Sequence, residues 1–297
     1  MDTWLNLCRW KNLSIITITQ ILVFLYLSRG NSGIEFNLNT YINVALLIFC
    51  TVLLAAGGFI VNDLFDEISD DHNKAGKKII GNKISFRDGQ IAYVVLVLSG
   101  NLIALLLSVR LNSFTEYLIY PLIVFLLWLY SYKLKCTPLA GNVFVSIFTS
   151  GVILIIPFAF RNELSLKSDQ TFLSFLIDYK NILLMGLFSF GINLYREVVK
   201  DLEDLSGDHL QGCQTTAIHF GETKTRIIST VLITSQLAIT FILIEVNLLS
   251  TILTSIPAVI LITLPYTKIG WNYKILSGLS KLYMIIGLLY FLTLYHG

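Results

Sequence analysis

Residues 62–71 read NDLFDEISDD and directly follow a long apolar run. Five of these ten residues are Asp or Glu. A second stretch, DLEDLSGD at 201–208, has the same spacing as DLFDEISD at 63–70, with Asp at its first, fourth and eighth positions. The chain therefore contains two acidic stretches built to one pattern.

On a helix, residues three, four and seven apart share a face. Each acidic stretch therefore predicts several acidic side chains on one helix face. Like charges so arranged repel each other, and a multivalent cation would remove that repulsion. The predicted faces contain Asn62, Asp63, Asp66 and Asp70 in the first stretch and Glu197, Asp201, Asp204 and Asp208 in the second.

The composition is that of a membrane protein. Apolar residues make up 55% of the 297 residues and charged residues only 13%, where soluble domains have about 25%. The net charge of +2 and the absence of a Lys/Arg-rich run exclude a nucleic-acid-binding protein. Four scattered cysteines without a C-x-x-C pair predict neither a zinc site nor a disulfide framework.

Nine apolar segments are long enough to cross about 30 Å of hydrocarbon. They lie at about 12–28, 40–61, 90–109, 113–132, 139–160, 178–195, 226–246, 248–266 and 276–295. Two joints are weak, because Pro121 interrupts the fourth segment and only Asn247 separates the seventh from the eighth. No small-residue cleavage site follows the first segment, so we expect it to be a spanning helix and not a signal peptide.

The basic residues predict the topology. Alternating the loops places sixteen of the 21 Lys and Arg residues on the side that holds the N-terminus and both acidic stretches. By the positive-inside rule that side is cytoplasmic and the C-terminus lies outside. The other side has Arg29, Arg110, Arg161, Lys167 and Lys180. This division requires an odd number of spans.

Both acidic stretches begin before an apolar helix has clearly ended. A carboxylate drawn toward hydrocarbon costs about 2.5–3.5 kcal/mol, so such residues usually face a polar cavity and mark function. The ligand pattern of an EF-hand calcium loop is missing, whereas Mg²⁺ needs only one or two carboxylates and is completed by substrate phosphates. The sequence thus predicts that Mg²⁺ and nearby cations grip a diphosphate. The candidate cations are Lys74, Lys77, Lys78, Lys133, Lys135, Arg196 and Lys200.

Several motifs resemble those of one family. NDLFDEISDDHNK at 62–74 is similar to the N-D-x-x-D-x-x-x-D motif of the UbiA superfamily of intramembrane prenyltransferases, and YREVVKDLEDLSGD at 195–208 to its second Asp-rich motif. YSYKLK at 130–135 and PLAGN at 138–142 resemble the stretch between them. The resemblance implies an all-α integral membrane protein, with nine helices in one bundle and a single domain over 1–297. It also implies a central cavity open to the cytoplasm and laterally to lipid.

The same resemblance implies the roles of individual residues. Asn62, Asp66 and Asp70 would hold one Mg²⁺ and Asp204 and Asp208 a second, with Asp63 and Asp201 assisting. The four aspartates Asp66, Asp70, Asp204 and Asp208 would be catalytic. The diphosphate would be bound by Lys74, Lys77, Lys78, Lys135, Arg196, Lys200 and Tyr130.

Some positions depart from the family's pattern. Asp71 and Ala75 stand where Arg and Pro are common, and Lys77-Lys78 replaces an Arg-Pro pair. Lysine keeps the positive charge but loses the bidentate geometry of arginine. His72 and His209 follow the last Asp of each stretch, as metal neighbours or as exposed loop residues.

The second motif most resembles the branch that transfers geranylgeranyl to geranylgeranylglyceryl phosphate. This implies a prenyl diphosphate donor, a lipophilic acceptor, surrounding membrane lipid and a prokaryotic cell membrane. Two alternatives stay open: an aromatic prenyltransferase acting on a quinone precursor, and a non-catalytic transporter or decayed paralogue.

Overall fold

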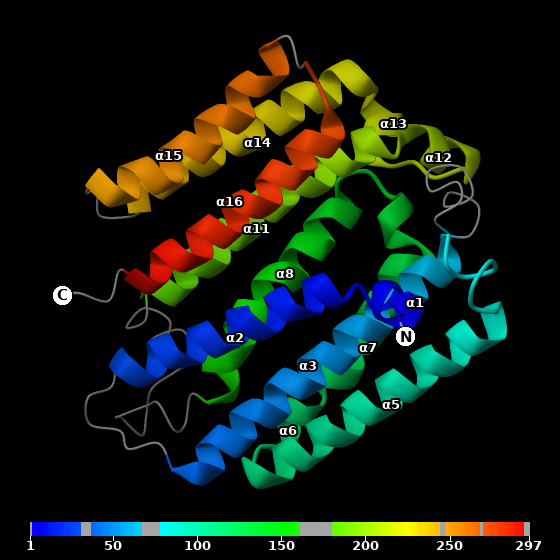
Figure 1. Ribbon diagram of the computed structural model, residues 1–297, viewed down its shortest axis with the longest axis vertical. Helices are drawn as coiled ribbons and strands as arrows, with labels where there is room; N and C mark the ends of the chain where they lie inside the picture. Colours follow the sequence, from blue (N-terminus) through cyan, green and yellow to red (C-terminus); the bar gives the residue numbers. More distant parts are fainter. Residues whose placement is uncertain are drawn as a thin grey trace. The chain divides into compact units, whose positions relative to one another are not determined.

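The computed structural model describes residues 2–30, 37–66, 78–160, 180–243, 248–267 and 270–293. Within these ranges the regular structure is helical, and one isolated bridge joins Ile80 to Ile84. The chain forms two compact units, Met1–Leu134 and Lys135–Gly297, which are described in turn (Figure 1).

Unit 1 is built around a long helix, α3. Its Asn37 N-cap accepts a hydrogen bond from the Thr40 amide at 3.0 Å, and its last residue is Phe65. The helices of unit 1 are α1 (Asp2–Leu7), α2 (Trp10–Gly30), α3 (Leu38–Phe65), α5 (Phe86–Arg110), α6 (Phe114–Tyr117) and α7 (Ile119–Tyr132).

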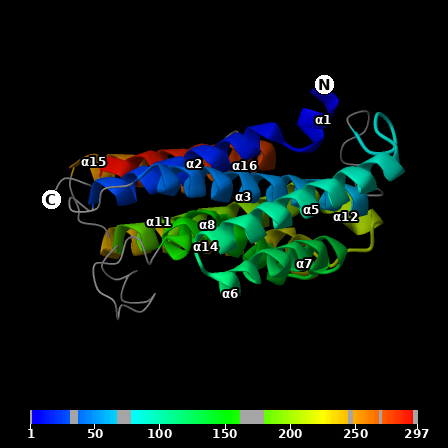
Figure 2. The ribbon, with the colours of Figure 1, turned by 90° about the horizontal axis from the view of Figure 1, so that it is seen from below.

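Helix α3 packs most extensively against α5, and the two lie side by side (Figures 1 and 2). A glycine makes this approach possible, since a Cβ on Gly100 would lie 2.6 Å from Leu54 Cδ2. The Cys50 thiol donates to the Gly100 carbonyl at 3.3 Å. Small residues at such a contact allow the close helix packing on which association in lipid depends.

The short helix α1 is fixed to the end of α3 that carries the first acidic stretch. Leu7 of α1 is buried with Ile60 of α3 and with Ile80 and Ile84 of the segment before α5. This apolar cluster holds both the N-terminus and the segment before α5 against α3.

Unit 2 is organised around α11, which contacts α8, α14 and α16. A Cβ on Gly287 of α16 would clash with the ring of Phe188 of α11, so these helices also approach closely at a glycine. The helices of unit 2 are α8 (Ala140–Ala159), α11 (Lys180–Glu203), α12 (Leu205–Leu210), α13 (Thr216–Phe220), α14 (Glu222–Leu243), α15 (Leu248–Thr263) and α16 (Tyr273–Thr293), with 3₁₀ turns η1 (Leu134–Cys136) and η2 (Leu264–Tyr266).

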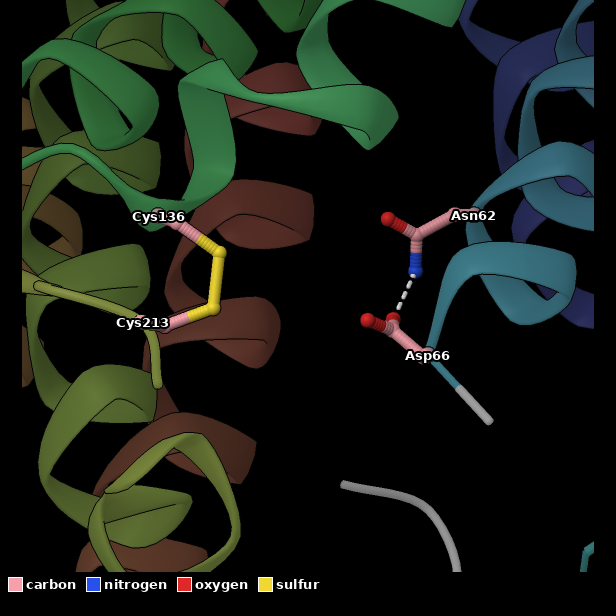
Figure 3. Close-up of a disulfide and its surroundings, with 4 residues drawn as sticks. All are labelled: Asn62, Asp66, Cys136 and Cys213. Atoms are coloured by element: carbon pink, nitrogen blue, oxygen red, sulfur yellow. Dashed lines mark hydrogen bonds between the residues drawn. A yellow bond between two sulfur atoms is a disulfide. The ribbon is translucent and has the colours of Figure 1, made fainter. Parts of the chain in front are cut away.

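A disulfide joins Cys136 to Cys213 within unit 2 (Figure 3). The prediction that the cysteines form no disulfide is therefore wrong for this pair. A separation of 77 residues leaves no local signal in the sequence. The pair meets because the backbone at Gln214 donates to the Cys136 carbonyl at 3.1 Å, bringing the segment after α12 against η1.

The predicted spans coincide with helices among the described residues. Six helices are long and apolar enough to cross a membrane: Trp10–Ser28, Leu38–Phe65, Phe86–Arg110, Ala140–Ala159, Lys180–Glu203 and Glu222–Ile242. The apolar helices Ile119–Tyr132 and Thr251–Tyr266 are shorter, and the ninth predicted segment forms α16. The chain is thus a multi-pass membrane protein with at least these six candidate spans.

The fourth predicted segment is divided into α6 and α7, close to the Pro121 that made it a weak joint. Pro121 lies in the first turn of α7, where its missing amide hydrogen costs no helix hydrogen bond. Asn247, the second weak joint, lies outside the described residues.

The disulfide should stabilise unit 2, because cross-linking a long loop restricts the unfolded chain. We expect Cys136→Ser to lower the free energy of unfolding in detergent by about 2–4 kcal/mol, with a reducing agent having the same effect on the unaltered protein. The half-buried free cysteine Cys8 supplies the control, since Cys8→Ser should leave the response to reductant unchanged. Recovery of Cys136 and Cys213 as free thiols from cells quenched with an alkylating reagent would contradict the assignment.

Candidate functional site

The first acidic stretch lies at the end of α3. Asn62 and Asp63 belong to the last turn of the helix, and Asp66 is its C-cap, with its amide donating to the Asn62 carbonyl at 3.0 Å. The Asn62 side chain donates through Nδ2 to Asp66 Oδ2 at 2.6 Å (Figure 3). Asn62 and Asp66 therefore place side-chain oxygen atoms, of the kind that bind metal ions, next to each other where the helix ends.

Asp63 has a different partner from Asp66. Arg9, in the connection between α1 and α2, donates through Nη2 to Asp63 Oδ1 at 2.7 Å. The Arg9 guanidinium also lies 5.0 Å from the centre of the Phe59 ring. Asp63 is thus ion-paired within unit 1, which ties the N-terminal segment to the motif.

Several predicted site residues lie outside the described residues: Asp70, Lys74 and Lys77, and with them Asp71, His72 and Ala75. Lys78 is described and buried, two residues before Ile80 of the apolar cluster. Tyr130 lies in α7 and is half-buried. The roles of these residues toward a diphosphate stay predictions.

Aromatic rings gather beside the first motif in unit 1. Phe65, the residue before Asp66, lies with its ring centre 5.9 Å from that of Tyr132 and 6.4 Å from that of Trp128. Trp128 and Tyr132 stack on successive turns of α7 with centres 5.2 Å apart. The sequence did not indicate which of its many aromatic residues would adjoin the motif.

The second acidic stretch begins inside α11 and crosses into α12. Helix α11 ends at Glu203 and α12 begins at Leu205, yet the Asp204 amide donates to the Lys200 carbonyl at 2.9 Å and the Asp208 amide to the Asp204 carbonyl at 3.0 Å. Because these helix-type hydrogen bonds flank the break, Asp204 and Asp208 remain neighbours as the predicted face requires. The Asp204 side chain does not cap α12.

The two cations of the second motif are paired with its glutamate. Glu197 is 9% exposed and contacts Arg196 Nη1 at 2.5 Å through Oε1 and Lys200 Nζ at 3.6 Å through Oε2. Glu197 was expected to extend the acidic face, and in the structure it balances the charge of Arg196 and Lys200. Diphosphate binding by these two cations stays a prediction.

The pKa of Asp208 is shifted by burial and by neighbouring groups. Burial, together with the neighbouring Asp204 carboxylate, raises the pKa of Asp208 to about 6, although Lys135, Lys200 and the Thr215 hydroxyl act in the opposite direction. A carboxylate whose charge is this unfavourable gains from a bound cation. His209 and Lys133, by contrast, are exposed.

Asp201 lies deeper in unit 2, in the last turn of α11. Its Oδ2 accepts hydrogen bonds from Asn142 Nδ2 at 3.0 Å and from the Thr216 amide at 3.1 Å. Asp201 and Asp63, the first aspartates of the two stretches, are therefore both bound by neighbours within their own unit.

The described residues offer the right chemistry for Mg²⁺. Asn62, Asp66, Asp204 and Asp208 supply amide and carboxylate oxygens, which hard cations prefer. In the part of the chain that the structure describes, no three His, Cys, Asp or Glu side chains form a metal-binding group.

The sequence did not predict three residues that contact the motif aspartates. Arg9 and Thr216 partner the motif aspartates, as does Asn142, which belongs to the PLAGN motif at 138–142. Arg9 lies 54 positions from Asp63, and Thr216 and Asn142 lie 15 and 59 positions from Asp201. No local sequence pattern links residues so far apart. Only the polar character of Asn142 at the start of an apolar segment could have drawn attention.

The comparisons with known proteins agree with these features. The chain is 31% identical over 193 residues to digeranylgeranylglyceryl phosphate synthase of Methanobrevibacter smithii, a match that covers 65% of this chain and 63% of that protein. A solved structure of a digeranylgeranylglyceryl phosphate synthase in membranes is similar over 98% of this chain and 97% of its own, with TM-score 0.66 and 23% identity.

A second solved structure has the same fold. It is a UbiA homologue from Archaeoglobus fulgidus bound to DMAPP and Mg²⁺, similar over 98% of this chain and 99% of its own, with TM-score 0.55 and 14% identity. The UbiA prenyltransferase family model matches residues 19–289, nearly the whole sequence. The chain therefore belongs to the UbiA prenyltransferase family.

Proposed function

We propose that the protein transfers a geranylgeranyl group from its diphosphate to geranylgeranylglyceryl phosphate, in a reaction that requires Mg²⁺. The observation that carries the proposal is the pair of equally spaced aspartate motifs, each at the end of an apolar helix. Membership of the UbiA family and the likeness to digeranylgeranylglyceryl phosphate synthases support it.

In this proposal the carboxylates hold the metal and the donor. Asn62, Asp66 and Asp70 bind one Mg²⁺, and Asp204 and Asp208 bind a second. The bound ions supply positive charge that stabilises the departing diphosphate. That the two motifs act on one substrate rests on their equal spacing and on the family. The A. fulgidus homologue, which has the same fold and is bound to DMAPP and Mg²⁺, supports a prenyl diphosphate donor and Mg²⁺.

The reaction breaks the bond between C1 of the allylic chain and the diphosphate oxygen. C1 then bonds to the glycerol hydroxyl oxygen of the acceptor, and the hydroxyl proton passes to the released diphosphate. Lysines near the motifs, Lys135 and Lys200 among them, bind phosphate oxygens. The rings of Phe65, Trp128 and Tyr132 lie beside the first motif and offer faces that stabilise the allylic cation.

We further propose nine membrane spans, with the N-terminus and both motifs in the cytoplasm and the C-terminus outside. The distribution of Lys and Arg supports this topology. Placed in this way, the motifs are open to water-soluble Mg²⁺ while the prenyl chains remain among the helices and in lipid.

Both motifs should be necessary for turnover. We expect Asp66→Ala and Asp204→Ala each to lower prenyl transfer in vitro by at least about hundredfold, because each loses charge stabilisation of the leaving group. A chelator should abolish activity of the unaltered protein, and Mg²⁺ should restore it. Glu203→Gln, which alters an exposed neighbour of Asp204, is the matched control and should stay active. Full activity of both alanine variants would refute the metal role.

The acceptor can be identified directly. The purified protein, supplied with geranylgeranyl diphosphate and a panel of acceptors, should form an ether with geranylgeranylglyceryl phosphate, detected by mass spectrometry. A product alkylated at ring carbon of a quinone precursor would instead establish aromatic prenyl transfer. Absence of any product, with Mg²⁺ present and the protein folded, would favour a non-catalytic role.

The topology predicts which side of the membrane is labelled. In Ser206→Cys the exposed thiol of α12 should resist an impermeant maleimide in intact cells and react after the cells are opened. Lys180→Cys, at the other end of α11, should be labelled in intact cells. Burial raises the pKa of the Cys8 thiol, which keeps background reaction at that cysteine low. Labelling of Ser206→Cys from outside would overturn the orientation.

A further inference from the structure

Asp201 takes part in a closed hydrogen-bond network with two buried residues of unit 2. Asn142 lies in the first turn of α8 and is 7% exposed, and Thr216 is the first residue of α13 and is fully buried. The network joins the end of α11 to the starts of these two helices, which are 74 residues apart in the sequence. It lies one turn before Asp204.

Each polar group in this network has a defined role. Asn142 donates through Nδ2 to Asp201 Oδ2 at 3.0 Å and accepts at Oδ1 from the Thr216 hydroxyl at 2.6 Å. The Thr216 amide donates to the same Asp201 oxygen at 3.1 Å. Donor and acceptor of the Asn142 amide are thus both used, which fixes its orientation.

The network also holds a strained residue. Leu139 has φ +57°, in the left-handed region that non-glycine residues seldom adopt. Its amide donates to the Thr216 hydroxyl at 2.9 Å, and the Thr225 hydroxyl donates to the Thr216 carbonyl at 3.2 Å. A backbone conformation of this kind persists only where the surrounding contacts impose it.

We infer that Asp201 is a positioning residue of the second motif and does not contact the metal. It fixes the end of α11 to the first turn of α8 and to the start of α13, and thereby sets where Asp204 and Asp208 stand. The inference rests on the proposed Mg²⁺ role of those two aspartates. It assigns to Asn142 and Thr216 a part in the site that no motif spacing indicated.

Substitutions at position 201 can separate a positioning role from a metal-binding role. The carbonyl oxygen of an asparagine at position 201 could still accept from Asn142 and from the Thr216 amide, whereas it loses the negative charge that a metal ligand contributes. Alanine loses both. Leaving the buried donors unsatisfied is unfavourable, so the network should loosen in Asp201→Ala and hold in Asp201→Asn.

Direct metal binding provides the test. Mn²⁺ binding by the full-length protein in detergent, followed by electron paramagnetic resonance with inorganic diphosphate present, is measured for each variant. We expect Asp201→Asn to bind within about twofold of the unaltered protein, and Asp201→Ala and Asn142→Ala to bind about tenfold more weakly. The double variant of the two alanine changes should be no weaker than either alone, since both break one network.

Two further variants complete the design. Ser150→Ala removes another buried hydrogen bond between α8 and α11, from Ser150 Oγ to the Gly186 carbonyl at 2.9 Å, away from the motif. It should lower the thermal unfolding midpoint without changing Mn²⁺ binding, which separates positioning from general stability. Asp204→Asn should abolish most of the binding.

Two outcomes would overturn the inference. Loss of Mn²⁺ binding in Asp201→Asn as large as in Asp204→Asn would make Asp201 a ligand. Unchanged binding in both Asp201→Ala and Asn142→Ala would remove its positioning role. Because none of these measurements needs an acceptor, a protein that shows the expected binding pattern yet forms no prenylated product would disprove the proposed function alone.

Discussion

A carboxylate at the end of an apolar helix must find a hydrogen-bond donor, a cation or a metal, because hydrocarbon offers none. Helices α3 and α11 both end in such carboxylates, and the structure around them consists largely of the partners that these groups require. Arg9 neutralises Asp63, and Arg196 with Lys200 neutralises Glu197. The first turn of α8 and the start of α13 approach α11 at Asp201.

The sequence predicted the helical segments well, because runs of apolar residues long enough to span a bilayer have few other solutions. It placed the end of the sixth segment near 195, where hydropathy falls, although α11 continues to Glu203. Hydropathy cannot detect that extension, since the last turns are held by Glu197 and Asp201 through polar contacts. The break between α6 and α7 was visible only because proline marks it.

The candidate site was predictable only in part, for a related reason. Spacing along one helix places Asn62 beside Asp66 and Asp204 beside Asp208, since a single helix turn decides both pairs. Contacts between different helices or loops leave no such pattern in the sequence. Neither the Arg9 pairing of Asp63, nor the disulfide of Cys136 with Cys213, nor the hydrogen bonds of Asn142 and Thr216 follow from any local pattern.

Equal spacing in the two motifs therefore does not imply that all of their aspartates have the same role. In each motif the first aspartate lies inside the helix, where protein groups surround it, and the second directly follows the last residue of the helix. A carboxylate that already accepts hydrogen bonds from buried donors gives up stabilisation if it turns to a metal. A carboxylate crowded by a like charge, as Asp208 is by Asp204, gains by doing so. The division that we propose between anchoring and metal-binding aspartates thus follows from the partners that each carboxylate has.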